Sequence, residues 1–429
     1  MNILIIDSMG LMLGLAMKLP ARHECRMYLA DKKEAWPNSG KGFVDFVPDY
    51  KPHISWADLI LIADVGYGKL ADSLRKKGKY VVGGTEATDR WELDRKLGQS
   101  ILKACGIDVL PAKEFSTIKS ALPFVESEAR KGIAYVSKPN DDKNDKSLSF
   151  VPKEPADLID MMHRWEKLGK IKSPFLLQRK VKGVEMAVGG WWTDRGWADD
   201  VCCENFEHKK FLSGDLGPNT GESGTVLKYV PIDKSRLGTE ILRPLEKALG
   251  KTDYVGYVDV NCIVVDGKKG WPLEFTMRPG YPTLYIQGGL HRVDYGTFFR
   301  GLVEYESDLF NLSDCAVGVV LAIPDYPYSR YTSKEVEGYP VSWTEKKGIY
   351  WVPQDIMKEG NRMVTAGDYI GVATGIGPKI RENREAANAF LKDSINMAPS
   401  RIFRDDIGEK LVRQIPELGS FGTNWKGAI

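Results

Sequence analysis

The chain has 429 residues, of which 43% are hydrophobic and 28% are charged. This length exceeds what one hydrophobic core usually organises, so we expect two to four packed units of ordinary globular composition. Sixty lysine and arginine residues against 58 aspartate and glutamate residues leave a formal net charge of +2. Such a balance does not favour nucleic acid or an anionic membrane as the main partner, and small molecules are the expected partners.

The cysteines and the first residues indicate the compartment. The six cysteines form no CxxC pair and no metal-like spacing to the five histidines, so reduced thiols are expected and a zinc site is not. The start, MNILIIDSMG, lacks the basic region of a signal peptide, and no apolar run approaches the roughly 20 residues of a transmembrane helix. We therefore predict a cytoplasmic protein without membrane contact. The sequence leaves open whether it is a monomer or a homodimer.

Strand-like and helical patterns alternate over the first 90 residues. The expected strands and helices are, in chain order, 3–6, 11–18, 59–63, 69–77 and 80–82. This alternation predicts a small parallel α/β domain over residues 1–90. Gly10 follows the first strand and could place an anion at a helix N-terminus, but the full GxGxxG spacing is absent.

Two further units are expected after residue 90. Residues 89–105 read as one helix, which Gly106 closes, and the later patterns predict an antiparallel sheet with a hairpin around Asp266-Gly267. The remaining elements of this second unit, residues 91–312, are expected at 134–137, 154–168, 175–177, 185–192, 254–265 and 271–275. A third unit of α+β type, residues 313–429, is expected from strands at 315–323, 348–351 and 369–374 and a helix at 381–394.

Polar side chains alternate along both strands of the predicted hairpin. Asp259 and Asn261 lie on the first strand, and Glu274 and Thr276 lie on the second. Alternation can place all four on one side of the sheet, where their oxygen atoms would suit a hard cation such as Mg²⁺. The alternative is that they are exposed polar positions of a half-buried sheet.

An arginine follows the second pair. Arg278 comes two positions after Thr276, where its guanidinium could bind a carboxylate or a phosphoryl group. This order resembles the signature of the ATP-grasp superfamily, and Asn261, Glu274 and Arg278 keep the intervals of that signature. Thr276 stands where asparagine is usual.

The segment 217–224, GPNTGESG, follows Glu207-His208-Lys209-Lys210 and Asp215. By itself it is either a constrained turn with free backbone NH groups or an ordinary surface turn. It resembles the GPNTGGMG and DHKR segments of phosphoribosylamine–glycine ligase, an ATP-grasp enzyme. The resemblance implies that Lys209 and Arg278 are catalytic residues. It also implies that the residues which bind substrate are Asp215, Gly217, Pro218, Asn219, Thr220, Gly221 and Arg278.

The same resemblance implies an ATP site. Lys96 and Lys138 fall where the family places two lysines for the ATP phosphates, and segment 177–185 resembles the hinge that receives adenine and ribose. The implied nucleotide-binding residues are Lys96, Lys138, Gln178, Lys180, Val181 and Glu185. Gln178 and Arg179 replace the usual acids of the hinge. Further matches at 318–322 and 404–408 make the resemblance collinear over about residues 1–410.

The resemblance implies a pre-ATP-grasp α/β domain, an ATP-grasp domain with a flap subdomain at about 112–178, and a small C-terminal α+β domain. The implied activity is that of an ATP-dependent carboxylate–amine ligase of purine biosynthesis, which forms an amide through an acyl phosphate. The implied cofactors are ATP and Mg²⁺ or Mn²⁺. Glycine is the favoured carboxylate substrate.

Two regions depart from the family pattern. The family's GGREHA turn and GPExPL loop are replaced by MGLMLG at 9–14 and DVGYGKL at 64–70, which lack an arginine for a phosphosugar. The glycine-rich flap is replaced by a polar loop at 139–147, in which Lys143, Lys146 and Ser147 could compensate. Two alternatives therefore stay open: a ligase for a different amine, such as a modified nucleotide or sugar, and a catalytically degenerate nucleotide-binding protein.

Overall fold

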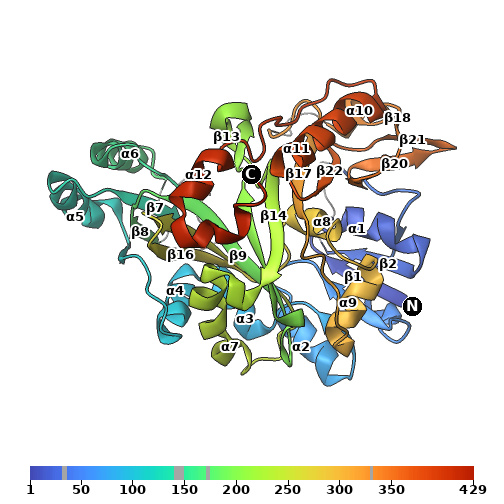
Figure 1. Ribbon diagram of the computed structural model, residues 1–429, viewed down its shortest axis with the longest axis horizontal. Helices are drawn as coiled ribbons and strands as arrows, with labels where there is room; N and C mark the ends of the chain where they lie inside the picture. The colour runs from blue at the N-terminus through green and yellow to red at the C-terminus, as the bar shows by residue number, and fades with distance from the viewer. Residues whose placement is uncertain (31–35, 140–148, 171–173, 329–331) are drawn as a thin grey trace.

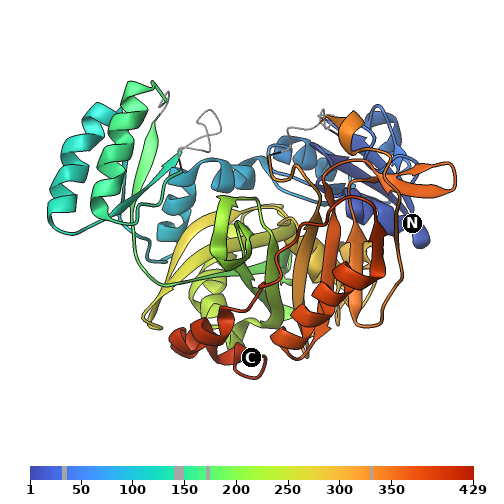
Figure 2. The ribbon, with the colours of Figure 1, turned by 90° about the horizontal axis from the view of Figure 1, so that it is seen from above.

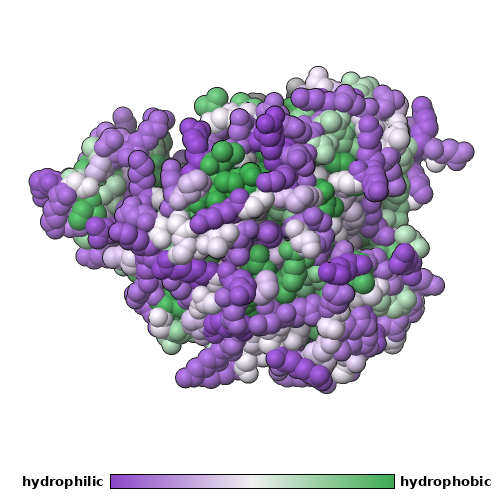
Figure 3. Space-filling model, in the orientation of Figure 1, coloured by the Kyte–Doolittle hydropathy of each residue, from purple (hydrophilic) through white to green (hydrophobic). Residues whose placement is uncertain are grey.

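The computed structural model describes residues 1–30, 36–139, 149–170, 174–328 and 332–429. Figures 1 and 2 show a broad body built on β-sheets, from which a smaller unit that carries helices α5 and α6 projects at one end. Over that unit the surface is mainly hydrophilic (Figure 3). No helix among the described residues has the length and apolar character needed to cross a bilayer.

A five-stranded parallel sheet forms the N-terminal part of the body. Its strands, in spatial order, are β3 (Asp45–Phe46), β2 (Glu24–Leu29), β1 (Asn2–Asp7), β4 (Leu59–Ile62) and β5 (Tyr80–Val82). Helices α1 (Leu13–Lys18) and α2 (Gly68–Lys76) connect successive strands. Strands β1 and β4 are almost wholly buried, as expected for parallel strands covered on both faces. The predicted parallel α/β fold of this part is confirmed.

A large antiparallel sheet of nine strands forms the rest of the body. Its strands, in spatial order, are β16 (Lys269–Thr276), β15 (Gly256–Val265), β9 (Val184–Thr193), β11 (Val201–Glu207), β14 (Gly224–Pro231), β17 (Cys315–Ala322), β22 (Tyr369–Gly377) and β19 (Ile349–Pro353), with β10 (Gly196–Trp197) paired to β9. The predicted hairpin is therefore present as β15 and β16. Strand β16 is the edge strand, with β15 between it and β9, and it lies on the side of the body that faces the projecting unit (Figure 1).

Each face of this sheet packs against a separate hydrophobic core. One core includes side chains from α7 (Arg243–Leu249), α11 (Ile380–Ala389) and α12 (Leu411–Glu417). The other includes side chains from α8 (Thr283–Gly288), α9 (Tyr295–Glu304) and the N-terminal sheet with α1. The N-terminal part is thereby joined to the second face of the large sheet by continuous apolar packing.

The projecting unit has its own sheet and its own core. Strands β6 (Ala112–Phe115), β8 (Phe175–Arg179) and β7 (Tyr135–Pro139) form a three-stranded antiparallel sheet beside α5 (Ile118–Arg130) and α6 (Pro155–Lys167). A cluster of apolar residues fills the space between this sheet and the two helices. The chain leaves and re-enters the body at neighbouring points, because Arg179 N donates to Pro111 O at 2.8 Å.

The single helix predicted over residues 89–105 is wrong. The structure has two helices, α3 (Glu86–Leu93) and α4 (Arg95–Ala104), which meet at Asp94 in an extended conformation. The Asp94 carboxylate accepts a hydrogen bond from Leu97 N at 3.0 Å, which caps the second helix. A side chain that caps a helix competes with the continuation of the preceding one, and this competition ends α3.

The strands predicted for a third unit join the large sheet. Strand β17 pairs with β14 on one side and with β22 on the other. Small two-stranded ladders, β18 (Val341–Trp343) with β23 (Ile395–Met397) and β20 (Ile356–Glu359) with β21 (Arg362–Thr365), lie beyond them, as does the short α10 (Ser333–Val336). The boundary expected between residues 312 and 313 thus falls inside one continuous sheet, and the division into domains stays a prediction. A ladder of β12 (Lys210–Leu212) and β13 (Leu216–Asn219) projects from the body.

Candidate functional site

The polar residues of the hairpin share one face of the sheet. In the register of β15 and β16, Asp259 lies opposite Thr276 and Asn261 lies opposite Glu274. Paired residues of antiparallel strands point to the same side, so all four side chains lie on one face, as the alternation predicted. Tyr257, two positions before Asp259 on the same face, still belongs to the apolar core. The polar site therefore begins where that core ends.

Asp259 is the buried member of this group. It is only 5% exposed, and its Oδ1 accepts hydrogen bonds from Asn205 at 3.1 Å and from the Tyr257 hydroxyl at 3.3 Å. Burial raises the pKa of Asp259 to about 7. Gly189 on the neighbouring strand leaves room for this cluster, since a Cβ there would lie 2.5 Å from Asp259 Oδ1.

Glu274 lies among three cationic side chains. Arg95 donates a hydrogen bond to its Oε2, and Lys138 Nζ from β7 lies 3.8 Å from the same atom. Burial alone would raise the pKa of Glu274, but Lys138, Arg95 and Lys209 lower it to about 2. Desolvation lowers the pKa of Lys138, while Glu274 acts in the opposite direction. The carboxylate of Glu274 is therefore ionised and accessible at the meeting point of the projecting unit and the large sheet.

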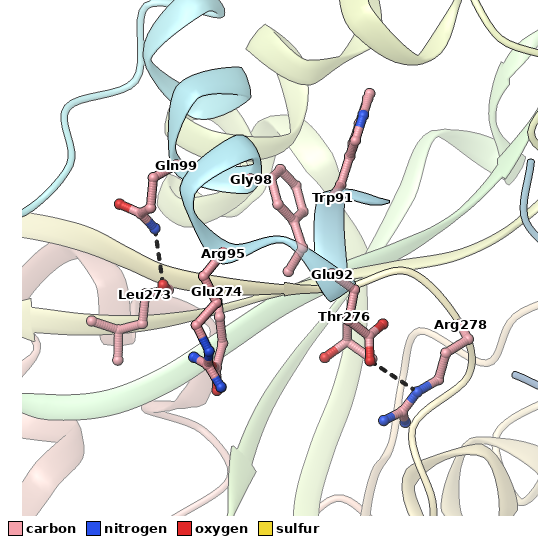
Figure 4. A pocket seen from close by; sticks show the side chains of 10 residues that line it. Trp91, Glu92, Arg95, Gly98, Gln99, Leu273, Glu274, Thr276 and Arg278 are labelled. Atoms are coloured by element: carbon pink, nitrogen blue, oxygen red, sulfur yellow. Dashed lines mark hydrogen bonds and ion pairs between the residues drawn. The ribbon is translucent and has the colours of Figure 1, made fainter. Parts of the chain in front are cut away.

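Arg278 lies beside this group at the end of β16. Its Nε lies 3.4 Å from Glu92 and 3.8 Å from Asp64. Although burial acts to lower it, these two carboxylates raise the pKa of Arg278. Figure 4 shows Arg278 directed toward Glu92, which also accepts a hydrogen bond from Met277 N at 2.6 Å. The arginine is thus fixed between the large sheet, α3 and the end of β4.

A small cavity lies between the hairpin and the two helices α3 and α4. It has a volume of about 170 Å³. Its lining residues are Trp91, Glu92, Arg95, Gly98, Gln99, Leu273, Glu274, Phe275, Thr276 and Arg278. Figure 4 shows that Gln99 also reaches β16, where its Nε2 donates to Leu273 O at 2.9 Å. The cavity connects Glu274 and Thr276 with the arginine that follows them.

Lys96 does not join this group, and Arg95 does. Lys96 Nζ lies 2.9 Å from Glu114 on β6, and its side chain is 68% exposed. Arg95 instead contacts Glu274. Arg95 precedes Lys96 directly in the sequence. The bend at Asp94 determines which of the two side chains is directed toward Glu274, so the sequence pattern alone did not identify Arg95.

The residues predicted for the hinge follow β8 and begin β9. Gln178 is buried in β8, and Glu185 is exposed on β9, on the face that carries Asn261. Val181 is half-buried between the strands, and Lys180 Nζ donates to Lys153 O at 3.1 Å. The expected hinge residues therefore lie close together in the fold. The loop residues Lys143, Lys146 and Ser147 lie outside the described residues.

Lys209 lies near Glu274, Glu185 and Glu207. Its Nζ is 3.1 Å from Glu207 Oε2, and this carboxylate is the main cause of the raised pKa of Lys209.

Two acidic residues of this region, Glu207 and the buried Glu222, were not predicted from the sequence. The carboxylate of Glu222 accepts a hydrogen bond from the Thr283 hydroxyl at 3.2 Å. Desolvation raises the pKa of Glu222 well above its ordinary value. Both residues lie in the segments that frame GPNTG, which is the signal that could have found them.

The GPNTG segment lies on the β12–β13 ladder and the turn that follows it. Thr220 Oγ1 donates to Lys209 O at 3.0 Å, which ties the turn to the catalytic candidate. Asp215 is directed elsewhere, since it accepts from Arg404 at 3.0 Å and from Lys410 at 3.1 Å. A cavity of about 340 Å³ lies against the turn, and its lining residues are Pro218, Asn219, Thr220, Gly221, Tyr326, Pro327 and Tyr328. Gly217 lies outside that lining, in β13.

The oxygen donors of the hairpin fit a magnesium ion that also binds phosphate. Glu274 is ionised, and Asn261 and Thr276 lie beside it on the same face. Among the described residues, no three His, Cys, Asp or Glu side chains form a metal site by themselves. Mg²⁺ is commonly bound by few protein ligands, with substrate phosphates and water completing its coordination. Asp259, the fourth predicted ligand, already accepts two hydrogen bonds at its Oδ1.

No protein-family model matches the chain. The chain is similar to the phosphoribosylamine–glycine ligase of Ralstonia nicotianae, with 22% identity over 364 residues that cover 80% of this chain and 82% of the relative. The crystal structure of phosphoribosylamine–glycine ligase from Thermotoga maritima superposes with a TM-score of 0.68 at 19% identity, over 95% of this chain and 100% of that one. The two share a fold that combines a parallel sheet with a large antiparallel sheet.

A second solved structure has the same fold and holds a nucleotide. It is the biotin carboxylase domain of the 2-oxoglutarate carboxylase from Hydrogenobacter thermophilus, in complex with MgADP, ADP and bicarbonate. The match has a TM-score of 0.60 at 10% identity and covers 93% of this chain and 91% of that one.

Proposed function

We propose that this chain, a divergent relative of the phosphoribosylamine–glycine ligases with an ATP-grasp fold, is an ATP-dependent carboxylate–amine ligase. The observation that carries the proposal is that three cationic side chains from separate segments surround Glu274 of the hairpin. They are Arg95 of α4, Lys138 of the projecting unit and Lys209, which follows β11. Cationic groups from separate segments around one ionised carboxylate suit a nucleotide triphosphate with its metal ion. The similarity to named ligases over four-fifths of the chain supports the same activity.

In this proposal Glu274, Asn261 and Thr276 would hold Mg²⁺, which would supply positive charge for the ATP phosphates. Arg95 and Lys138 neutralise the remaining phosphate charge. Gln178, Lys180, Val181 and Glu185 receive the adenine and ribose. Lys96 stays a weaker candidate for a phosphate contact, because it is paired with Glu114.

The reaction follows from these positions. A carboxylate oxygen of the first substrate attacks the γ-phosphorus of ATP, the bond to ADP breaks, and an acyl phosphate forms. The amine then attacks the acyl carbon and loses a proton, and phosphate leaves as the amide forms. Arg278 and Lys209 stabilise the negative charge that develops, and the chain contributes mainly positioning and electrostatic stabilisation. Glycine is the proposed carboxylate, bound near residues 217–221.

A coupled assay tests the proposal. Purified protein is supplied with ATP, Mg²⁺, glycine and a panel of primary amines, and ADP, phosphate and amide are measured. The expected result is that all three products form in equal amounts, and only when both glycine and an amine are present. Nucleotide binding without any amide across the panel would instead identify a protein that binds ATP without ligase activity.

A further inference from the structure

The first turn of the parallel sheet is filled by a carboxylate of the chain itself. Strand β1 ends at Asp7, and the turn 8–12 leads into α1. In parallel α/β sheets, ligands bind outside the carboxyl ends of the strands, and backbone NH groups at such turns are common receptors for phosphate. Here the NH groups point at Asp7 instead of at the solvent.

Four consecutive backbone NH groups donate to this carboxylate. Met9, Gly10 and Leu11 donate to Oδ1 at 3.1, 3.0 and 3.0 Å, and Met12 donates to Oδ2 at 2.7 Å. Gly10 adopts a positive φ of 90°, which allows the chain to wrap around the anion. Asp7 itself is 0% exposed. The anion receptor of the turn is therefore complete without a ligand.

This turn lies next to the candidate active site. The Tyr285 hydroxyl from α8 donates to Leu11 O, and the Tyr281 hydroxyl donates to Ala63 O at 2.9 Å. Both tyrosines belong to the segment that follows Arg278. Ser8, inside the turn, donates to Asp64 at 3.3 Å, and Asp64 in turn faces Arg278.

Arg278, in the same region, is the arginine that the proposed mechanism assigns to the reacting acyl phosphate. Arg278 is paired with Asp64 and Glu92. A phosphate of an incoming substrate would meet Asp7 and Asp64 as like charges, which disfavours its binding. The relatives are named for phosphoribosylamine, a substrate with a phosphate group. At the corresponding end of this chain's sheet, four NH groups of the first turn already donate to Asp7.

We propose that Asp7 determines substrate specificity: its carboxylate takes the place of a substrate phosphate, so the acceptor of this chain is a primary amine without a phosphate group. The inference rests on the proposed ligase function and names the class of its amine substrate. Asp7 acts as a positioning and excluding residue and does not touch the reacting atoms.

Matched pairs of amines test the inference in turnover. Ethanolamine is compared with O-phosphoethanolamine, and glucosamine with glucosamine 6-phosphate, at saturating ATP and glycine. For each pair of amines that the enzyme turns over, we expect kcat/KM to be at least about tenfold higher for the unphosphorylated amine, because like-charge contacts disfavour the phosphorylated one. A preference for the phosphorylated member would overturn the inference and leave the ligase function intact.

A binding measurement decides the question even if no amine is turned over. Backbone amide signals of Met9, Leu11 and Met12 are observed in protein labelled selectively with ¹⁵N-methionine and ¹⁵N-leucine, while inorganic phosphate is added. In the native protein we expect no saturable shifts. In Asp7→Gly, whose turn has lost its internal anion, we expect saturable shifts at these amides.

The controls separate the role of Asp7 from a general loss of structure. Asp58→Asn removes an exposed carboxylate at the opposite end of the same sheet, where Asp58 accepts from Asn2 N at 2.8 Å, and should behave as the native protein. If Asp7→Gly does not fold, Asp7→Asn replaces it in the titration, because the amide oxygen still accepts hydrogen bonds from the turn while the negative charge is lost. The titration of the native protein does not depend on either variant. Saturable phosphate shifts at Met9 to Met12 in the native protein would overturn the inference, whatever the activity results.

Discussion

Arg95 and Lys96 are neighbours in the sequence, and the bend at Asp94 sends their side chains in different directions. Arg95 reaches Glu274, whereas Lys96 reaches Glu114. We expect Arg95→Gln to weaken the binding of MgATP about 10- to 100-fold, because a hydrogen bond to a charged group is worth about 1.5–3 kcal/mol. Isothermal titration calorimetry measures the effect.

Lys96→Gln is the matched control for this prediction. It removes one cationic side chain from the same helix, in an exposed ion pair that contributes little. We expect a change in affinity of less than about threefold, corresponding to the usual range of exposed pairs. A larger loss of MgATP affinity in Lys96→Gln than in Arg95→Gln would contradict the prediction. It would show that Lys96, and not Arg95, is directed toward the nucleotide when MgATP is bound.

Glu204 makes the stability of the protein depend on pH. It is 0% exposed in β11 and accepts hydrogen bonds from Trp425 Nε1 at 2.7 Å and Asn424 Nδ2 at 3.2 Å. Burial raises its pKa from the ordinary 4.5 to about 7. Between these two values the folded protein retains a proton that the unfolded chain has released. The contribution of Glu204 to the free energy of unfolding therefore falls as pH rises from 4.5 to 7 and is constant outside that range.

Glu204→Gln should remove this dependence. We expect the free energy of unfolding of the variant, relative to the native protein, to rise by up to about 3 kcal/mol between pH 4.5 and 7. Urea unfolding at four pH values in this range measures the difference. Glu417→Gln, at an exposed position of α12, is the control and should leave the difference near zero. A pH-independent difference for Glu204→Gln would contradict the prediction.

At the scale of elements, ion pairs hold the β12–β13 ladder against the C-terminal segment. Asp215 accepts from Arg404 and Lys410, Ser213 Oγ donates to Asp405 at 2.7 Å, and Arg404 is only 1% exposed. The role predicted for Asp215 from the sequence was contact with substrate. The ion pair suggests instead that Asp215 holds the GPNTG segment in place.

Asp215→Asn distinguishes the two roles. We expect it to lower the free energy of unfolding by about 2–3 kcal/mol, because the buried Arg404 loses one of its carboxylate partners while it keeps Asp406. Chemical denaturation measures this change, and steady-state kinetics gives the KM for glycine. Ser213→Ala, which removes one exposed hydrogen bond of the same ladder, should cost less than about 0.5 kcal/mol. Unchanged stability with a raised KM would favour direct substrate contact.

The site could be predicted from sequence where it depends on local periodicity. Alternation along two strands joined by an Asp-Gly turn was enough to place Asp259, Asn261, Glu274 and Thr276 on one face. Arg95 could not be found in this way, because its direction depends on a helix cap that ends α3. Likewise, four residues around Gly10 became a filled anion receptor only through the conformation of the turn.

Contacts between segments that are distant in the sequence could not be predicted either. Glu222 and Glu207 meet the site through the pairing of β11 with β14 and the packing of α8, and no local pattern specifies those neighbours. The same holds for the order of the large sheet. Strand β17 could be recognised from its apolar run, but its insertion between β14 and β22 depends on the whole fold.

At the scale of the whole molecule, the continuous nine-stranded sheet and the separate core of the projecting unit predict opposite results for two deletions. Removal of residues 313–429 takes away β17, β22 and β19 and exposes β14, whose Val226 and Leu227 are wholly buried in the two main cores. We expect this truncated chain not to fold, because a long apolar edge strand is left without a partner.

Removal of residues 112–178 should be tolerated. The apolar cluster of that unit is separate from the two main cores, and Pro111 and Arg179 are hydrogen-bonded neighbours, so a short Gly-Ser linker can close the gap. We expect this variant to unfold in one cooperative transition, as measured by circular dichroism and urea denaturation, and to lose MgATP affinity because Lys138 is gone. A folded chain that ends at residue 312, with its own cooperative transition, would establish the domain boundary that the sequence suggested.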